Sequence, residues 1–197
     1  MANKKTDMKD RIIASAFTLF SVYGFSATTI EQIIEKAGCS KGTFYHYFPG
    51  KASILRSWID VMDMDYQKWY EECDKELPAL EQLGLFNDYI LSKLENFADL
   101  ETLSTIYAFQ LNLEEDQQFW KTNRQLNTVL SAILKSGQQR GEIRNDISFV
   151  ELSKMYLTVH RGILYEWCIS KGTYSFKEYG NKLMSMFLPS FASQNVI

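Results

Sequence analysis

The chain of 197 residues has only three cysteines, two histidines and three prolines. The shortage of cysteine and histidine bears on disulfide, metal and catalytic sites. The cysteines lie far apart with no Cys-x-x-Cys or Cys/His spacing, so we expect neither a disulfide framework nor a zinc site. No nucleophile with an orienting base emerges around His46 or His160. A glycine-rich phosphate loop and a His-Glu-x-x-His spacing are also missing. The sequence therefore predicts no catalytic site, no metal and no cofactor.

Long apolar runs are missing as well. No stretch approaches the roughly 20 apolar residues of a membrane span, and the N-terminus reads MANKKTDMKDR, without the apolar run of a signal peptide. We expect a cytoplasmic protein with no membrane partner. Its 46% hydrophobic and 14% aromatic residues are enough for a full core, in one domain or in a small domain joined to a larger one.

Negative charge is concentrated in the middle of the chain. The formal net charge is -3, yet residues 1–59 hold eight Lys or Arg against four Asp or Glu. Residues 60–116 hold three against fifteen, and residues 117–197 hold ten against five. Phosphate would attract the basic end of the chain and repel its acidic middle, and this would orient the molecule. The alternative is that the acidic residues between 60 and 76 form the solvated face of a helix.

Residues 29–51 predict a helix, a tight turn and a second short helix. The first helix has one apolar stripe at i, i+3, i+4 and i+7, made by Ile30, Ile33, Ile34 and Ala37. Gly38 is its C-terminal stop, and Ser40 is a good N-cap for the next helix. Gly42 costs a helix about 1 kcal/mol relative to alanine, so something is expected to approach the backbone there. A wall of the DNA major groove is a good candidate.

This N-terminal quarter resembles the DNA-binding domain of TetR-family transcriptional regulators. The resemblance rests on IIASAFTLFSVYGF, TTIEQIIEKAG, CSKGTFYHYF and Lys51 at the start of a fourth helix, with departures at Ile34 and Cys39. It implies an all-α fold with a three-helix helix-turn-helix domain at 1–50 and a larger helical effector-binding and dimerisation domain at 51–197. The DNA contacts that it implies are Thr28, Thr29 and Lys51 to phosphate, Lys41, Gly42 and Thr43 toward bases, and Tyr45 and His46 to either.

Helical periods continue along the rest of the chain. The fourth helix is expected to run from Lys51 to about Leu77, where Pro78 ends it. Further helices are predicted at about 80–98, 101–113, 116–140, 148–171 and 175–190. The last two predicted helices carry apolar residues over a wider arc than packing against one core requires. This suggests that they also pack against a second molecule. The resemblance implies that they pair with the same helices of another subunit, through Leu152, Val159, Ile163, Trp167, Leu183 and Phe187.

Aromatic residues on several predicted helices are candidates for an effector cavity. They are Tyr66, Tyr89, Phe109, Trp120 and Tyr156, and Glu95, Glu114 or Asp116 is a candidate carboxylate beside them. The alternative is that these rings are plain core. The predicted function is a ligand-responsive repressor that binds a palindromic DNA operator as a homodimer and is released by an unknown, apolar or aromatic small molecule. The other hypothesis is a helical adaptor or coactivator of the same fold that acts through protein contacts.

Overall fold

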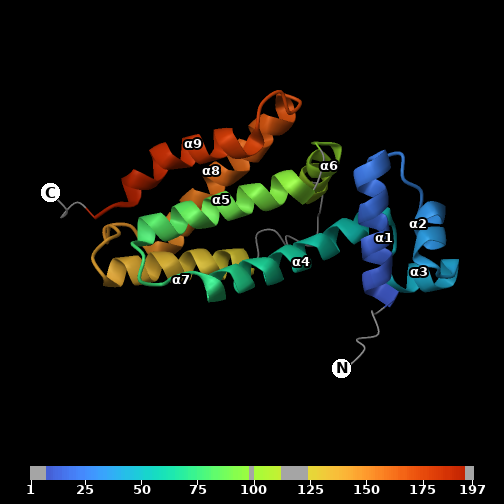
Figure 1. Cartoon of the computed structure of the whole chain (residues 1–197), viewed down its shortest axis with the longest axis horizontal. Coiled ribbons are helices and arrows are strands. Elements are labelled where there is room, and N and C mark those ends of the chain that lie inside the picture. The colour runs from blue at the N-terminus through green and yellow to red at the C-terminus, as the bar shows by residue number, and fades with distance from the viewer. Residues whose placement is uncertain (1–7, 98–99, 112–123, 194–197) are drawn as a thin grey trace. The chain divides into compact units, whose positions relative to one another are not determined.

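The computed structural model describes residues 8–97, 100–111 and 124–193, and it confirms the all-α prediction. Every regular element in these ranges is helical, and the one β-type contact is an isolated bridge between Ile143 and Ala192 (Figure 1). The described residues form two compact units, one from 8–62 with 101–111 and one from 63–97 with 100 and 124–193. By packing, the chain therefore divides inside the fourth helix, whereas the family resemblance implied a division between residues 50 and 51.

The first unit contains α1 (Met8–Tyr23), α2 (Ile30–Ala37), α3 (Lys41–Tyr47), the start of α4 (Lys51–Glu72) and most of α6 (Leu100–Leu111). Its core consists of the apolar residues that recur at helical spacing in the sequence. They are Ile12, Ala16, Phe20, Ile33, Ala37, Phe44, Phe48, Ile54 and Leu55, all at most 3% exposed. Burying such side chains is the main stabilising contribution to a domain of this size.

The second unit contains α5 (Ala79–Phe97), α7 (Gln125–Gln139), α8 (Phe149–Ile169), α9 (Phe176–Phe187) and the 3-10 turn η2 (Leu188–Phe191), with the end of α4. α5 packs against α7 and α9, and α8 packs against the same two helices. Glycines allow two close approaches. A Cβ on Gly137 would lie 2.5 Å from Ala79, and one on Gly180 would lie 2.6 Å from Leu91.

Two helix ends differ from the sequence predictions. α4 ends at Glu72, five residues before Leu77, because Asp74 accepts the Glu76 N–H and Lys75 Nζ donates to the Tyr70 and Cys73 carbonyls. These polar contacts stabilise a turn in place of further helix. α9 ends at Phe187 and is followed by η2, and the described part of the predicted 116–140 helix begins at Gln125. Residues 112–123, where that prediction starts, lie outside the described ranges.

Candidate DNA-binding and effector sites

Local capping interactions build the sharp turn between α2 and α3. Thr29 caps α2 through a capping box with Gln32, each side chain accepting the other residue's N–H. At the other end Gly38 has φ +63°, a left-handed conformation that disfavours any side chain. The Cys39 N–H donates to the Ile34 carbonyl, and the Arg11 guanidinium donates to the Ala37 carbonyl at 2.7 Å. The helix therefore stops at the position that the glycine predicts.

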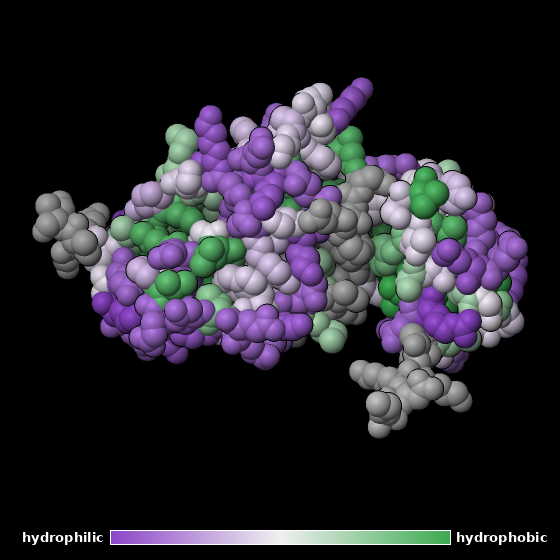
Figure 2. All heavy atoms as spheres, in the orientation of Figure 1, coloured by the Kyte–Doolittle hydropathy of each residue, from purple (hydrophilic) through white to green (hydrophobic). Residues whose placement is uncertain are grey.

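Helix α3 is held by its buried rings and presents its other side to solvent. Ser40 caps it by accepting the Thr43 N–H at 3.0 Å, and Phe44 and Phe48 anchor it in the core. Its remaining face carries Lys41, Gly42, Tyr45 and His46, all exposed, with Thr43 half-buried beside them. The surface over α2 and α3 is largely hydrophilic (Figure 2). This is the helix-turn-helix geometry, with the first turn of the second helix free to meet a ligand.

Gly42 is not required by packing inside the subunit. A Cβ built there would meet only Ser40 Oγ, at an ordinary 3.8 Å. The close approach that the sequence predicted for this position would therefore have to come from outside the protein. Lys41 adds a positive charge beside it, and its single ion pair, to Glu31, is long at 3.9 Å and exposed at both ends. Such an exposed pair contributes little and leaves the ammonium available to phosphate or bases.

Thr28 does not match its predicted role. Its side chain is 1% exposed, and its hydroxyl donates to the Gly24 carbonyl at 2.8 Å. The expectation of a phosphate contact from this side chain is therefore corrected, because the hydroxyl hydrogen is used inside the subunit. Thr29 remains exposed at the N-terminus of α2, where its side chain acts as the cap. Helix N-termini attract anions through their free N–H groups, so a phosphate contact near Thr29 stays a prediction.

Lys51 is turned toward the protein. Its ammonium donates to the carbonyls of Phe25, Ser26 and Thr28 at 2.5, 3.2 and 2.7 Å, and it lies 4.4 Å from the centre of the Phe25 ring. An ammonium has three hydrogens, and all three have a partner here. Burial lowers the pKa of Lys51, while the nearby Glu101 carboxylate raises it. The structure therefore makes Lys51 a support for the loop between α1 and α2, in place of the expected phosphate contact.

Glu101, which sequence reasoning missed, joins the first turn of α6 to the same loop. Its carboxylate accepts the Ser26 N–H at 2.7 Å, and the hydrogen bonds from Ser26 lower the pKa of Glu101. Gly24, with φ +78°, makes room for it, since a Cβ there would lie 2.3 Å from Glu101 Oε2. No sequence pattern connects two residues that are 75 positions apart, so only the fold reveals this contact.

Two of the predicted effector residues are buried in the core. Tyr66 and Tyr156 are 4% and 0% exposed, burial raises the pKa of both phenols, and the Tyr156 hydroxyl donates to the Leu83 carbonyl. Tyr66 meets Tyr89 edge to face, with ring centres 6.4 Å apart. The side chain of Phe109 and all of Trp120 lie outside what the structure describes, as do Glu114 and Asp116. The structure thus brings Tyr66 and Tyr89 together as packed rings.

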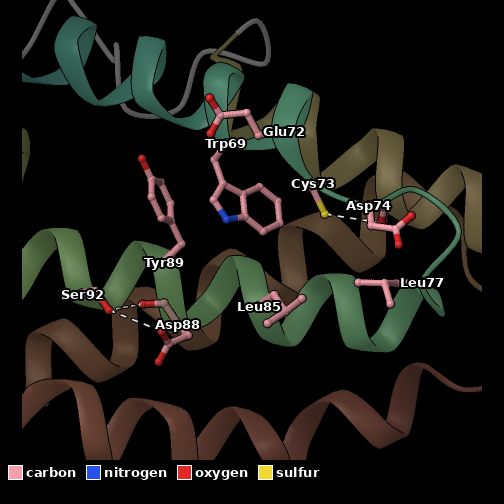
Figure 3. Close-up of a pocket in the computed structure, with 9 residues that line it drawn as sticks. All are labelled: Trp69, Glu72, Cys73, Asp74, Leu77, Leu85, Asp88, Tyr89 and Ser92. Atoms are coloured by element: carbon pink, nitrogen blue, oxygen red, sulfur yellow. Dashed lines mark hydrogen bonds between the residues drawn. The ribbon is translucent and has the colours of Figure 1, made fainter.

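An open cleft lies between the end of α4 and α5, with a volume of about 420 Å³ (Figure 3). Of the predicted effector residues whose side chains the structure describes, Tyr89 alone lines it. The described lining residues are Trp69, Glu72, Cys73, Asp74, Leu77, Leu85, Asp88, Tyr89 and Ser92. Glu95, the remaining candidate carboxylate, instead accepts from the Ser175 hydroxyl and the Lys177 N–H at the start of α9. Trp69 follows Tyr66 by three residues, a spacing typical of the apolar side of a helix, and this pattern gives no sign that its ring borders open space.

The structure corrects part of the predicted dimer surface. Leu152 and Ile163 are each 1% exposed within the subunit, so they offer no surface to a partner. Trp167 donates to the Tyr174 carbonyl and packs on Phe176, yet it is partly exposed and stays a candidate. Val159, Leu183 and Phe187 remain partly exposed and stay candidates.

Other exposed residues mark a face on α8 and α9. Met155, Gly162 and Ile169 are spaced by seven along α8, and Tyr179 and Met186 are spaced by seven along α9. All five are exposed. A seven-residue spacing keeps side chains on one side of a helix that pairs with another helix at a shallow angle. We call these five residues the heptad face.

Two kinds of feature are absent from the ranges that the structure describes. No group of three or more His, Cys, Asp or Glu side chains there is placed to hold a metal ion. No helix in these ranges has both the length and the apolar character needed to cross a bilayer.

A capped helix, a glycine turn and a short helix with an exposed first turn define the class of helix-turn-helix DNA-binding proteins. Residues 12–57 match the family model described as bacterial regulatory proteins, tetR family. Over these residues the chain matches the TetR family of transcriptional regulators.

Relatives of known name match along most of the chain. A fatty acid metabolism regulator protein of Bacillus subtilis is 24% identical over 90% of this chain and 92% of its own length. The transcriptional regulator QacR of Staphylococcus aureus is 27% identical over 80% of this chain and 85% of its own. Among solved structures, Thermus thermophilus FadR in complex with lauroyl-CoA superimposes with a TM-score of 0.71 at 19% identity, over 92% of this chain and 93% of FadR. This last similarity shows that the fold is shared.

Proposed function

We propose that this protein is a ligand-responsive transcriptional repressor. Two copies bind one palindromic operator, and a small-molecule effector releases them. The observation that carries the proposal is the first turn of α3, where Lys41 and Gly42 are exposed and Thr43 is half-buried beside them. Tyr45 and His46 extend this surface by one turn. Side chains at the start of a recognition helix are the ones that reach base edges in the major groove.

The heptad face supports the dimer. Four of its members are large apolar side chains, each at least 37% exposed, and the fifth is Gly162, where an added Cβ would meet nothing within 4 Å. Apolar surface in such a pattern is buried when two copies pack their last helices into a four-helix bundle. A two-fold dimer places two recognition helices about one DNA turn apart, roughly 34 to 36 Å, which requires a palindromic site.

Control by a small molecule is supported by the named relatives. The Bacillus subtilis relative is a fatty acid metabolism regulator, and the Thermus thermophilus structure contains lauroyl-CoA. For this chain we propose an apolar or aromatic effector held by the unit that contains α5, α7, α8 and α9. Because binding free energies are linked, an effector that weakens operator binding must itself bind more weakly to the operator complex, typically by 5 to 150-fold.

Selection from a randomised duplex library tests the DNA assignment. We expect a palindromic site, and an affinity whose logarithm falls with log salt by about 0.9 per neutralised phosphate. Thr43→Val and Lys41→Met should each weaken the selected site by about 1 to 3 kcal/mol and change its sequence preference. Lys36→Met, which removes an exposed charge on α2, is the matched control and should leave the sequence preference unchanged.

The alternative, an adaptor that acts through protein contacts, predicts a different result in the same experiment. No palindrome would be enriched, and the variants on α3 would not differ from the α2 control. That outcome would contradict the repressor assignment.

A further inference from the structure

We propose that the amide pair Asn87–Asn181 fixes the rotation of α9 about its own axis, and thereby selects the side chains that α9 offers to a second subunit. The first half of this statement rests only on contacts inside one compact unit, which contains both α5 and α9. The second half rests on the proposed function, because it takes the heptad face as the dimer contact. The two asparagines are then positioning residues for the dimer.

Apolar side chains leave the rotation of α9 open. With about 100° between successive residues, those of α9 cover an arc of about 160°, from Met186 to Met184. A helix that packs on one core needs a stripe of roughly 100°. Several rotations of α9 would therefore bury a full apolar stripe, and they would differ in which side chains stay outside. In the structure Met184 is buried, whereas Tyr179 and Met186 are exposed.

Polar contacts distinguish these rotations. α9 lies alongside α5 (Figure 1). The Asn87 side-chain N–H donates to Asn181 Oδ1 at 2.6 Å, and the Asn181 side-chain N–H donates to Asp88 Oδ1 at 2.7 Å. Lys177, one turn earlier on α9, places its ammonium 3.1 Å from the same Asp88 oxygen. Two polar side chains on one edge of α9 thus pair with two on α5.

Asn87 makes the innermost of these contacts. It is 2% exposed, and its neighbours one turn away on α5, Leu83 and Leu91, are fully buried. Its Oδ1 has no hydrogen-bond partner within the described ranges, and its N–H is satisfied by Asn181. Burying an amide without a partner is costly, whereas a paired amide contributes little net stability. The pair therefore acts mainly by penalising the arrangements that break it.

A rotated α9 would break the pair. Asn181 lies about 60° from Met184 around the helix, on the side away from Met186. If α9 turned by about 60° to centre its apolar arc on the core, the Asn181 amide would move by about 5 Å, beyond hydrogen-bond reach of Asn87. The same turn would carry Tyr179 toward the core and Met184 out of it. The amide pair thus keeps Tyr179 and Met186 outside, where the heptad face needs them.

Buried polar pairs can select one arrangement at a cost in stability. A single buried asparagine fixes the register of some coiled coils while lowering their stability. Replacing buried polar groups by apolar residues of similar volume often leaves a protein folded and even stabilises it. Two opposite effects are therefore expected when both asparagines become leucine, namely unchanged or higher stability and a less defined rotation. A merely stabilising contact would show a loss of stability with unchanged geometry.

Electron–electron double resonance within one subunit tests the rotation without DNA. Nitroxides are attached at Glu81→Cys on α5 and Glu178→Cys on α9, both exposed positions, in protein whose three native cysteines are alanine. Labelled protein is diluted with unlabelled protein, so that only the distance inside a subunit is measured. We expect Asn87→Leu with Asn181→Leu to broaden the distance distribution at least about twofold, or to shift it by more than about 3 Å. Lys177→Met, which removes the exposed ion pair and keeps the amide pair, should leave the distribution unchanged.

Thermal unfolding completes the test. The double leucine variant should melt no lower than the wild type, whereas Asn181→Leu alone leaves the Asn87 amide unpaired and should melt about 3 to 10 °C lower. Asn87→Ala with Asn181→Ala is the second double variant, for the case that two leucines do not fit, and should broaden the distribution in the same way. The rotation assignment is overturned if a folded double variant keeps the wild-type distribution, if the leucine pair melts as low as Asn181→Leu, or if neither double variant folds.

Selection of operators separates this inference from the proposed function. Half-sites of random sequence are presented with variable spacing between them. The wild type should enrich one spacing and the double leucine variant several, because the separation of the recognition helices follows the dimer geometry. A single spacing for a variant with a broadened distribution overturns the dimer role and leaves the rotation assignment in place. A wild type that enriches no palindrome overturns the repressor function, while the resonance result still decides the rotation.

Discussion

Lys51 provides a test in which the sequence and the structure predict different results. The resemblance to the family assigns its ammonium to a DNA phosphate, whereas the structure directs all three hydrogens to the carbonyls of Phe25, Ser26 and Thr28. The variant Lys51→Met keeps the apolar stem of the side chain and removes only the charged end. Lys41→Met is the control, because Lys41 is exposed and has only one long ion pair.

The expected loss of stability follows from the hydrogen bonds. A hydrogen bond to a charged group contributes about 1.5 to 3 kcal/mol when it is well buried, and partial exposure reduces this. The three bonds of Lys51 share one partly exposed ammonium, so we expect Lys51→Met to lower the free energy of unfolding by about 2 kcal/mol. Lys41→Met should change it by less than about 0.5 kcal/mol.

Two measurements distinguish the roles. Urea unfolding of both variants gives the stability change, with an unchanged m-value showing that the unfolded state is unaffected. The salt dependence of operator binding counts phosphate contacts, since losing one reduces the slope by about 0.9. We expect Lys51→Met to lose stability and keep the wild-type slope. A stable Lys51→Met protein with a reduced slope would refute the structural role and restore the phosphate contact.

Three further predictions concern the body of the protein. Burial, with the charge of Arg161, lowers the pKa of His160 to about 4, so between pH 6.5 and 4 the unfolded chain binds a proton that the folded chain does not. As the pH is lowered over that range, the free energy of unfolding should fall by up to about 3 kcal/mol. His160→Gln should remove this dependence of stability on pH above pH 5, and urea titrations at each pH measure it. Ile169→Glu should give monomers in sedimentation velocity while the control Met64→Glu, at a side chain that is more exposed still, stays dimeric, and a dimeric Ile169→Glu protein would move the interface elsewhere. Gly137→Ala should lower the melting temperature through a loss of about 1 to 3 kcal/mol, because its Cβ would lie 2.5 Å from neighbouring side chains, whereas Gly84→Ala on open α5 surface should raise it.

The helix-turn-helix could be predicted from the sequence because its determinants are local. Thr29 with Gln32, and Ser40 with Thr43, are cap partners three residues apart, and Gly38 takes the left-handed conformation expected at a helix end. Interactions across one turn of helix depend little on the rest of the fold. The same holds for the apolar stripes, whose period identifies the buried side of α2 and α3.

The end of α4 shows where local reasoning was incomplete. Pro78 was expected to end this helix, but the contacts of Asp74 and Lys75 end it at Glu72. The sequence is compatible with a helix end at Glu72 or just before Pro78. The helix ends at Glu72 because the polar groups that follow it satisfy the last carbonyls of the helix.

Which side of an apolar helix faces the core of its own subunit was decided only by tertiary packing. α8 has apolar residues around much of its circumference, so periodicity could not separate Ile163, which packs against α9, from Ile169, which is exposed. Threonine and lysine side chains can both bind phosphate when they have no partner inside the protein, so the residue types of Thr28 and Lys51 allowed a phosphate contact. Their hydroxyl and ammonium are bound to carbonyls that only the folded loop brings within reach. Sequence determined the local elements through contacts a few residues apart, whereas the use of Thr28, Lys51 and Glu101 depended on partners 4 to 75 positions away.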